Sequence, residues 1–175
     1  MTYNWQHQNW PNFQYDLDTL QQLFLEFSLE WAELSGMEKG LSTDLEEETV
    51  INIMVSEAIK SSAIEGEFYS REDVMSSIKN KLGLNQPPAT IKDRYSAGIA
   101  ELMVEVRSSF LEPLSTEMLK NWHKILFSHA KNLLVGDWRA GQEPMQVASG
   151  SIGREIVHFE APPSDQVANE TLKLW

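Results

Sequence analysis

Apolar residues recur at the spacing of an α-helix through the N-terminal and central parts of the chain. The first stretch covers residues 17–34, where apolar side chains stand three or four positions apart, and Asp16 precedes it as an N-cap. Thr43 and Glu46 form a T-x-x-E capping box at the start of a second stretch, 43–66, whose apolar residues fall on one helical face. The pattern therefore predicts two long helices.

Three shorter helices are predicted next, over residues 70–82, 90–110 and 115–126. Each begins at a serine or a threonine, because these residues cap the N-terminus of a helix with a side-chain oxygen. Gly83 is expected to end the first of them, since glycine takes the left-handed conformation that closes a helix.

The spacing of apolar residues changes from helical to alternating near the C-terminal end. Residues 145–148 and 155–159 flank a turn rich in glycine and serine, 149–153, which predicts a β-hairpin. A last helix follows from Ser164, and its apolar pattern still runs at Trp175, so we expect the chain to be a piece of a longer protein. The predicted fold class is mainly α, with one β-hairpin.

Composition and charge narrow the classes of function. The 175 residues are 42% hydrophobic and contain no cysteine, so they can bury a core but form no disulfide or thiolate metal site. The net charge of -12 argues against nucleic acid and membrane as partners, because an acidic surface repels phosphate groups. The sequence has no signal peptide and no apolar run long enough to span a bilayer, and we expect a cytoplasmic protein.

The chain opens with a segment dense in aromatic residues, which are Trp5, Trp10, Phe13 and Tyr15. This density favours an extended arm whose rings pack on a protein surface. The surface is either the protein's own core, which we favour, or that of a partner.

The sequence shows no residue set that is typical of catalysis. Its four histidines lack a partner at the spacing that holds a metal ion, and we predict no metal site. His123 lies beside Trp122 on an apolar helix side, which favours a structural role. Because phosphate-binding glycine loops and a nucleophile elbow are also absent, we expect no catalytic residue in this chain.

The segment Ser61-Ser-Ala-Ile-Glu65-Gly66 closes the second predicted helix. A carboxylate near a helix C-terminus is disfavoured by the helix dipole, so Glu65 in that place suggests a cationic partner. The most natural partner is an arginine bound by two hydrogen bonds. A simpler interpretation is a polar helix end with Gly66 as its C-cap, and the spacing alone leaves both open.

This segment resembles the inhibitory motif [Ser/Thr]-x-x-x-Glu-[Gly/Asn] of the Fic family, with Ser61, Glu65 and Gly66 at the matching positions. Residues 3–13 resemble the start of an uncharacterised domain that often precedes Fic domains, and residues 150–163 resemble part of the Fic core. On these grounds the chain is identified as the N-terminal piece of a bacterial Fic (Fido-fold) protein. The catalytic loop of that family, HxFx(D/E)GNGRxxR, is absent from the sequence.

The resemblance implies a helical N-terminal domain at 1–84, which carries the inhibitory helix, and the first part of a Fic core at 85–175. It implies autoinhibited AMPylation, in which an ATP- and Mg²⁺-dependent adenylyltransferase (a nucleotidyltransferase) modifies Ser, Thr or Tyr hydroxyls of a target protein. ATP and Mg²⁺ would be bound by the complete enzyme. Glu65 would pair with the arginine that otherwise binds the ATP γ-phosphate, while Ser61 and Gly66 would hold the helix near the nucleotide.

The predicted hairpin, at about 145–159, resembles the Fic flap, on which a target segment adds as an extra strand. The implied docking residues are Arg154, Ile156, Val157, His158 and Phe159. The structural alternative is an edge that only covers the core.

Two other readings stay open. One is a truncated Fic-like module that binds or inhibits a partner Fic protein, and the other is a small helical interaction domain unrelated to nucleotides. A homodimer and AMP removal in place of AMP addition are also compatible with the sequence.

Overall fold

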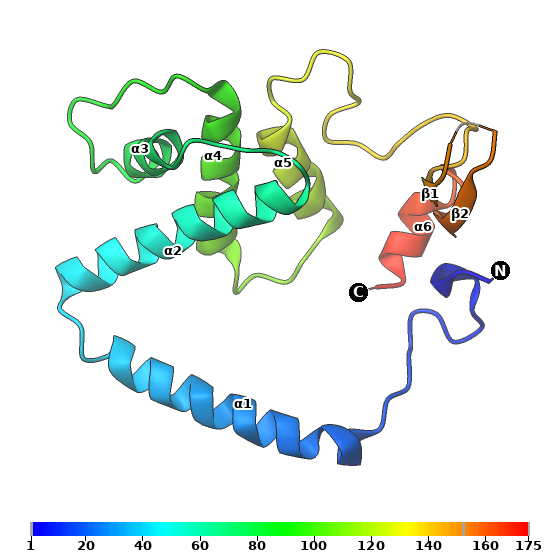
Figure 1. Ribbon diagram of the computed structural model, residues 1–175, viewed down its shortest axis with the longest axis horizontal. Coiled ribbons are helices and arrows are strands. Elements are labelled where there is room, and N and C mark those ends of the chain that lie inside the picture. Colours follow the sequence, from blue (N-terminus) through cyan, green and yellow to red (C-terminus); the bar gives the residue numbers. More distant parts are fainter. Residues whose placement is uncertain (1, 152, 175) are drawn as a thin grey trace. The chain divides into compact units, whose positions relative to one another are not determined.

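The computed structural model describes residues 2–151 and 153–174 (Figure 1). Contacts within the chain group it into two compact units. Unit 1 contains residues 1–14, 113–124 and 132–175, and unit 2 contains residues 15–112 and 125–131.

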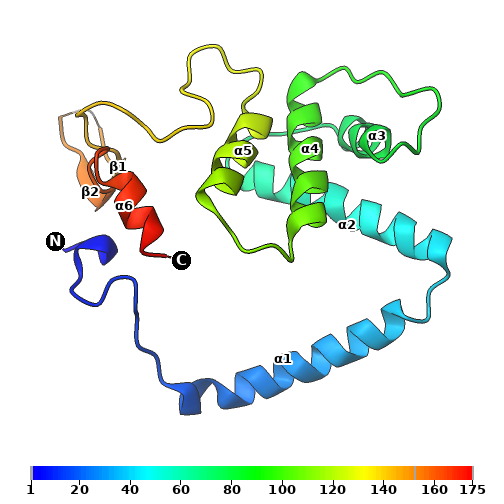
Figure 2. The same ribbon diagram turned by 180° about the vertical axis from the view of Figure 1, so that it is seen from behind.

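Unit 2 is built from helices, as the apolar spacing predicts. Its members are α1 (Leu17–Glu38), α2 (Thr43–Ile64), α3 (Arg71–Lys81) and α4 (Arg94–Ser109). α3 packs against both α2 and α4, and α2 also meets α4, which the views from the front and from behind both show (Figure 1, Figure 2). These three helices enclose the core of the unit.

The buried apolar side chains come from those three helices. They are Ile51, Met54, Val55 and Ala58 of α2, Val74 and Ile78 of α3, and Ile99 and Ala100 of α4. A close backbone approach adds the end of α5 (Thr116–Leu126) to this unit, because a Cβ built on Gly98 would lie 3.2 Å from the backbone oxygen of Leu126. The apolar face predicted for residues 43–66 is thus the face that α2 buries.

The second long helix begins at residue 43 as predicted, but the cap predicted at Thr43 is wrong. Two predicted starts are also wrong, because residue 90 does not begin α4 and Ser164 does not begin the last helix, α6 (Val167–Leu172). Thr43 is the first residue of α2 and Ser42 is its N-cap, because the first helical hydrogen bond runs from the Glu46 N–H to the Ser42 carbonyl oxygen, at 2.9 Å. α4 begins at Arg94 and not near residue 90. There the Asp93 carboxylate accepts hydrogen bonds from the first turn of the helix and so sets its start.

The caps predicted at Asp16, Ser70 and Ser115 are confirmed. The Asp16 carboxylate accepts from the Asp18 N–H at 3.0 Å, Ser70 Oγ accepts from the Asp73 N–H at 3.4 Å, and Ser115 Oγ accepts from the Met118 N–H at 3.2 Å. Each side chain satisfies one backbone donor that the helix itself leaves free.

α1 differs from the other helices of unit 2. It is described along its whole length, and it buries none of its residues. Phe27 and Trp31 stack on each other with their ring centroids 6.4 Å apart, yet they are 67% and 60% exposed. The helical spacing predicted α1 correctly, but it does not indicate which surface packs against this helix.

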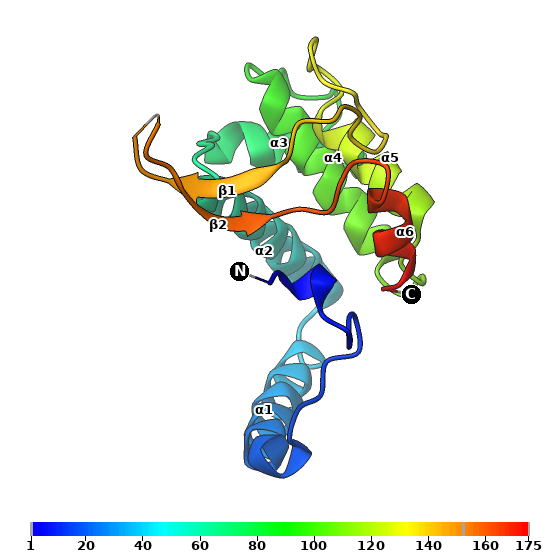
Figure 3. The ribbon, with the colours of Figure 1, turned by 90° about the vertical axis from the view of Figure 1, so that its right-hand side faces the viewer.

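Unit 1 contains the rest of α5, a β-hairpin and a short helix. Its elements are the 3-10 turn η1 (Asn4–Gln6), β1 (Gln146–Ser149), β2 (Ile156–Glu160) and α6 (Val167–Leu172). The two strands lie side by side in Figure 3 and pair antiparallel. The predicted mainly helical fold with one hairpin is therefore confirmed.

The hairpin has an irregular register. Val147 pairs with Phe159, but Ala148 pairs with Val157, so His158 is the extra residue of a β-bulge. Gly150 closes the turn with φ at 108°, and a Cβ there would lie 2.6 Å from the Arg154 carbonyl oxygen. Only glycine fits that position without a shift of the backbone.

Among the residues that the structure describes, no helix has the length and apolar character needed to cross a membrane.

Candidate functional site

The C-terminal end of α2 holds the segment Ser61–Gly66 in a fixed geometry. The Gly66 N–H donates to the Ala63 carbonyl oxygen at 3.1 Å, and the Glu67 N–H donates to the Ser62 carbonyl oxygen at 2.9 Å. With Gly66 at a φ of 85°, these two bonds form a Schellman motif. Glu65 is the C-cap of the helix, with φ -84° and ψ 2°.

Ser61 is engaged within its own helix. Its Oγ donates to Glu57 Oε1 at 2.7 Å, one turn earlier along α2. The structure therefore gives Ser61 a local partner, and both residues lie on the exposed side of the helix.

The Glu65 side chain is exposed, and it makes no hydrogen bond or ion pair with residues 2–151 or 153–174. Its neighbours Ile64 and Phe68 are 83% and 82% exposed. A carboxylate near two exposed apolar side chains at a helix end can bind a cation that lies beside an apolar surface.

Tyr69 follows this segment and is half-buried. Burial raises the pKa of its hydroxyl, and the nearby carboxylates of Glu67 and Asp93 raise it further. The surroundings of the α2 end are thus acidic, which favours a positively charged partner.

The predicted flap residues lie on the hairpin of unit 1. Arg154 is in the turn before β2, and Ile156, Val157, His158 and Phe159 follow one another along β2. Ile156 is 63% exposed, while His158 Nε2 lies 2.7 Å from Ser149 Oγ on β1.

The rings of Phe159 and Tyr3 meet edge to face, with their centroids 5.5 Å apart. The hairpin thus turns Phe159 toward its own unit and leaves Ile156 accessible. Among the described residues the sheet has two strands, so each strand keeps one edge without a strand partner, to which a further strand can add.

The N-terminal arm packs against the same hairpin. Trp5 Nε1 donates to the Glu160 carbonyl oxygen at 2.7 Å, and Trp10 and Phe13 make an edge-to-face ring pair at 5.6 Å. Phe13 and Tyr15 are 55% and 69% exposed. The arm therefore covers part of its own chain with its two tryptophans and leaves Phe13 and Tyr15 largely exposed.

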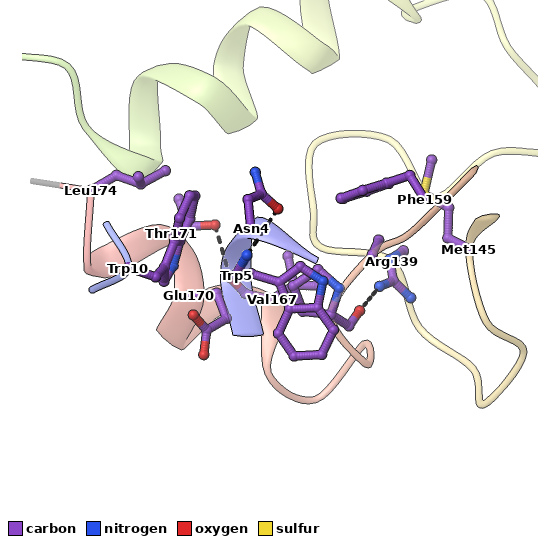
Figure 4. A pocket seen from close by; sticks show the side chains of 12 residues that line it. Asn4, Trp5, Trp10, Arg139, Met145, Phe159, Val167, Glu170, Thr171 and Leu174 are labelled. Atoms are coloured by element: carbon purple, nitrogen blue, oxygen red, sulfur yellow. Dashed lines mark hydrogen bonds between the residues drawn. The ribbon is translucent and has the colours of Figure 1, made fainter. Parts of the chain in front are cut away.

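Arm, hairpin and α6 together line a pocket of about 320 Å³ (Figure 4). Trp5 and Trp10 stand on its wall with Glu170 of α6, and Arg139 donates to the Pro162 carbonyl oxygen at its edge. Sequence reasoning did not identify this pocket. The aromatic arm was its one visible signal, since Arg139 and Glu170 lie in segments with no distinguishing pattern.

α5 is tied to the loop that follows it. Lys120 Nζ lies 2.7 Å from Asp137 Oδ1 and 5.4 Å from the centre of the Trp138 ring. The hydrogen bond from Lys120 holds the pKa of the Asp137 carboxyl below its ordinary value. His123 Nδ1 accepts a hydrogen bond from the Gly136 N–H at 2.8 Å, which gives this histidine a structural role.

The described residues contain no group of three or more His, Asp or Glu side chains that could hold a metal ion. The Ser61–Gly66 segment belongs to unit 2 and the hairpin to unit 1.

Comparison with known families gives a match in the N-terminal part of the chain. Residues 3–84 are similar to a domain of unknown function, DUF4172. The matched stretch begins with residues 3–13, which resemble the start of an uncharacterised domain in the sequence analysis. A comparison with curated proteins found no match.

This result corrects the identification from sequence. The family model that matches is DUF4172 and not a Fic or Fido model, so the identification of the chain as a Fic protein is wrong. The physical reason lies in the motif itself. Gly66 is required by its positive φ and Ser61 bonds to Glu57, so an ordinary helix end accounts for two of the three matched positions.

Proposed function

We propose that this chain is a regulatory part of an ATP-dependent AMP-transferase that acts on the hydroxyl groups of a target protein. In this proposal Glu65 is the inhibitory residue. It binds an arginine of the catalytic site and keeps that arginine from the phosphates of ATP, since one guanidinium cannot serve both anions at once.

The observation that carries the proposal is the state of the Glu65 side chain. The carboxylate is exposed and unpaired among the described residues, while the Schellman motif fixes the backbone beneath it. The backbone at Glu65 is already ordered, so binding a guanidinium orders only the side chain of this residue.

The role proposed for this chain is regulation without catalysis. In this proposal the groups that bind Mg²⁺ and ATP belong to the catalytic site of the complete enzyme. The hairpin supports the proposal in a second way, because the unpaired edges of β1 and β2 suit a target segment that adds as a strand.

The test uses the complete protein encoded by the gene, incubated with labelled ATP and Mg²⁺. We expect the Glu65→Gly variant to incorporate at least about tenfold more AMP into protein than the unchanged sequence, because losing a charge-assisted pair frees the arginine. Glu67→Gly is the matched control, since Glu67 is also exposed and lies two residues away. Equal incorporation by the two variants, or none by either, would overturn the proposal.

A second candidate is a binding module that restrains a separate enzyme chain. The exposed Ile64 and Phe68 beside Glu65 favour it, because they offer apolar contact to a partner surface. If the 175-residue chain, added in excess, restores inhibition to the complete Glu65→Gly protein, the contact works between chains. If it has no effect, inhibition acts within one chain.

A further inference from the structure

α1 presents an apolar stripe along one side. The side chains of Leu17, Leu20, Phe24, Phe27, Trp31 and Leu34 follow one another at steps of three and four residues and so share a face of the helix. Five of the six are between 55% and 67% exposed. Exposed apolar stripes of this length are rare on proteins that act alone and mark docking surfaces.

The charges of α1 all have one sign. The helix carries Asp18, Glu26, Glu30, Glu33 and Glu38 and contains no lysine, arginine or histidine. At 100° per residue, Asp18, Glu26 and Glu33 lie on the side away from the stripe, while Glu30 borders it and Glu38 ends it. A surface that docks on the stripe therefore meets negative charge at its margin.

The stripe continues into a groove between the end of α1 and the start of α2. Trp31, Leu34, Val50 and Ile53 contribute to its apolar wall, and its volume is about 320 Å³. Glu38 of α1 and Glu46 of α2 also line it. The groove thus has the same features as the adjacent stripe, an apolar surface with carboxylates at its border.

The charge pattern decides between occupants. A second copy docked on the stripe would bring Glu30 and Glu38 of both helices to one interface without a cation to pair with them, which costs free energy through like-charge repulsion. A bilayer with anionic lipid is disfavoured for the same reason. A protein surface with apolar side chains between lysines or arginines gains both apolar contact and charge pairing.

We propose that α1 and its adjoining groove form a docking surface for a partner protein that presents apolar side chains flanked by lysine or arginine. The surface is separate from Glu65, and the proposal does not depend on the function proposed above.

Two synthetic helical peptides test it. Both carry the same row of leucines, and lysines flank the row in one while glutamates flank it in the other. With the 175-residue chain, we expect the lysine peptide to bind at least about tenfold more tightly than the glutamate peptide, as measured by fluorescence anisotropy. Equal affinities, or no binding of either peptide, would contradict the proposal.

A matched pair of variants separates apolar docking from charge attraction alone. Phe27→Glu and Leu29→Glu each add one negative charge to α1, at side chains that are 67% and 63% exposed, but two residues turn the helix by 200° and place Leu29 on the other side. We expect Phe27→Glu to weaken binding of the lysine peptide at least about tenfold and Leu29→Glu to leave it unchanged or strengthen it. Similar effects of both variants would show that the stripe is not the contact.

Sedimentation of the chain alone completes the test. We expect a monomer, and circular dichroism of Phe27→Glu should match that of the unchanged chain, because the substituted side chain is exposed. A dimer that Phe27→Glu dissociates would make a second copy the occupant of the stripe and overturn the proposal.

Discussion

α1 and α2 are helices of the same length, 22 residues each, and both follow from the spacing of their apolar residues. α2 buries Ile51, Met54, Val55 and Ala58, whereas α1 buries none of its residues. The difference shows that helical periodicity predicts which residues share a face and that burial depends on what other helices offer. α2 meets α3 and α4, and α1 presents its face to solvent.

The largest expected effect is a difference in the free energy of unfolding between a substitution in α2 and one in α1. Ile51→Ala in α2 removes a side chain that is 3% exposed and should lower the free energy of unfolding by about 2 to 5 kcal/mol. Leu23→Ala in α1 truncates a side chain that is 60% exposed and should change it by less than about 0.5 kcal/mol. Urea unfolding followed by circular dichroism measures both values.

Ile53→Ala is the control for that comparison, because Ile53 lies on α2 but is 62% exposed. It should resemble Leu23→Ala and not Ile51→Ala, with a change of about 0.5 kcal/mol. A loss at Leu23 as large as that at Ile51 would mean that α1 is packed in solution.

The sequence predicted the helices and the hairpin because these depend on local periodicity, which the residues carry themselves. It missed the caps at Ser42 and Asp93, where neighbouring polar residues compete for the same role and geometry decides between them. It could not predict that α1 is exposed, since burial requires a partner that periodicity does not name.

For the candidate site, too, local features could be predicted from the sequence and features formed by distant segments could not. A polar helix end closed by Gly66 was one of two readings left open, and the structure shows such an end, with Glu65 as the C-cap and Gly66 in the left-handed position after it. The Fic identification was wrong because a short motif with a local structural reason carries little information about family. The pocket beside Trp5 and Trp10 was missed because its walls come from segments far apart in the sequence.

A smaller effect distinguishes the two helices by their glycines. Gly66 after α2 has a φ of 85°, so Gly66→Ala should destabilise the unit by about 1 to 2 kcal/mol, the cost of a left-handed alanine. Gly36 lies inside α1 with open space around it, and Gly36→Ala should favour the helix by about 0.5 to 1 kcal/mol. Unfolding and helical circular dichroism measure the two changes, and equal signs would contradict this account.

The smallest expected effect concerns the start of α1. The side-chain hydroxyl of Thr19 donates to Asp16 Oδ2 at 2.6 Å, and this bond, together with the Asp18 N–H, lowers the pKa of the Asp16 carboxyl. A lowered pKa means that the charged Asp16 carboxylate is more stable in the folded helix than in the unfolded chain. This charge therefore stabilises the helix at pH values above the ordinary titration range of aspartate, and the stabilisation is lost as the pH falls below about 4.

Helical circular dichroism of α1 should therefore fall slightly between about pH 5 and pH 3, and Asp16→Asn should remove that pH step while keeping an oxygen that can cap the helix. Because α1 makes no contribution to the buried core, this change should leave the unfolding of α2, α3 and α4 unaltered. A pH step of the same size in Asp16→Asn would assign it to another carboxylate, and a shift in the urea midpoint with Asp16→Asn would show that α1 and the core unfold together.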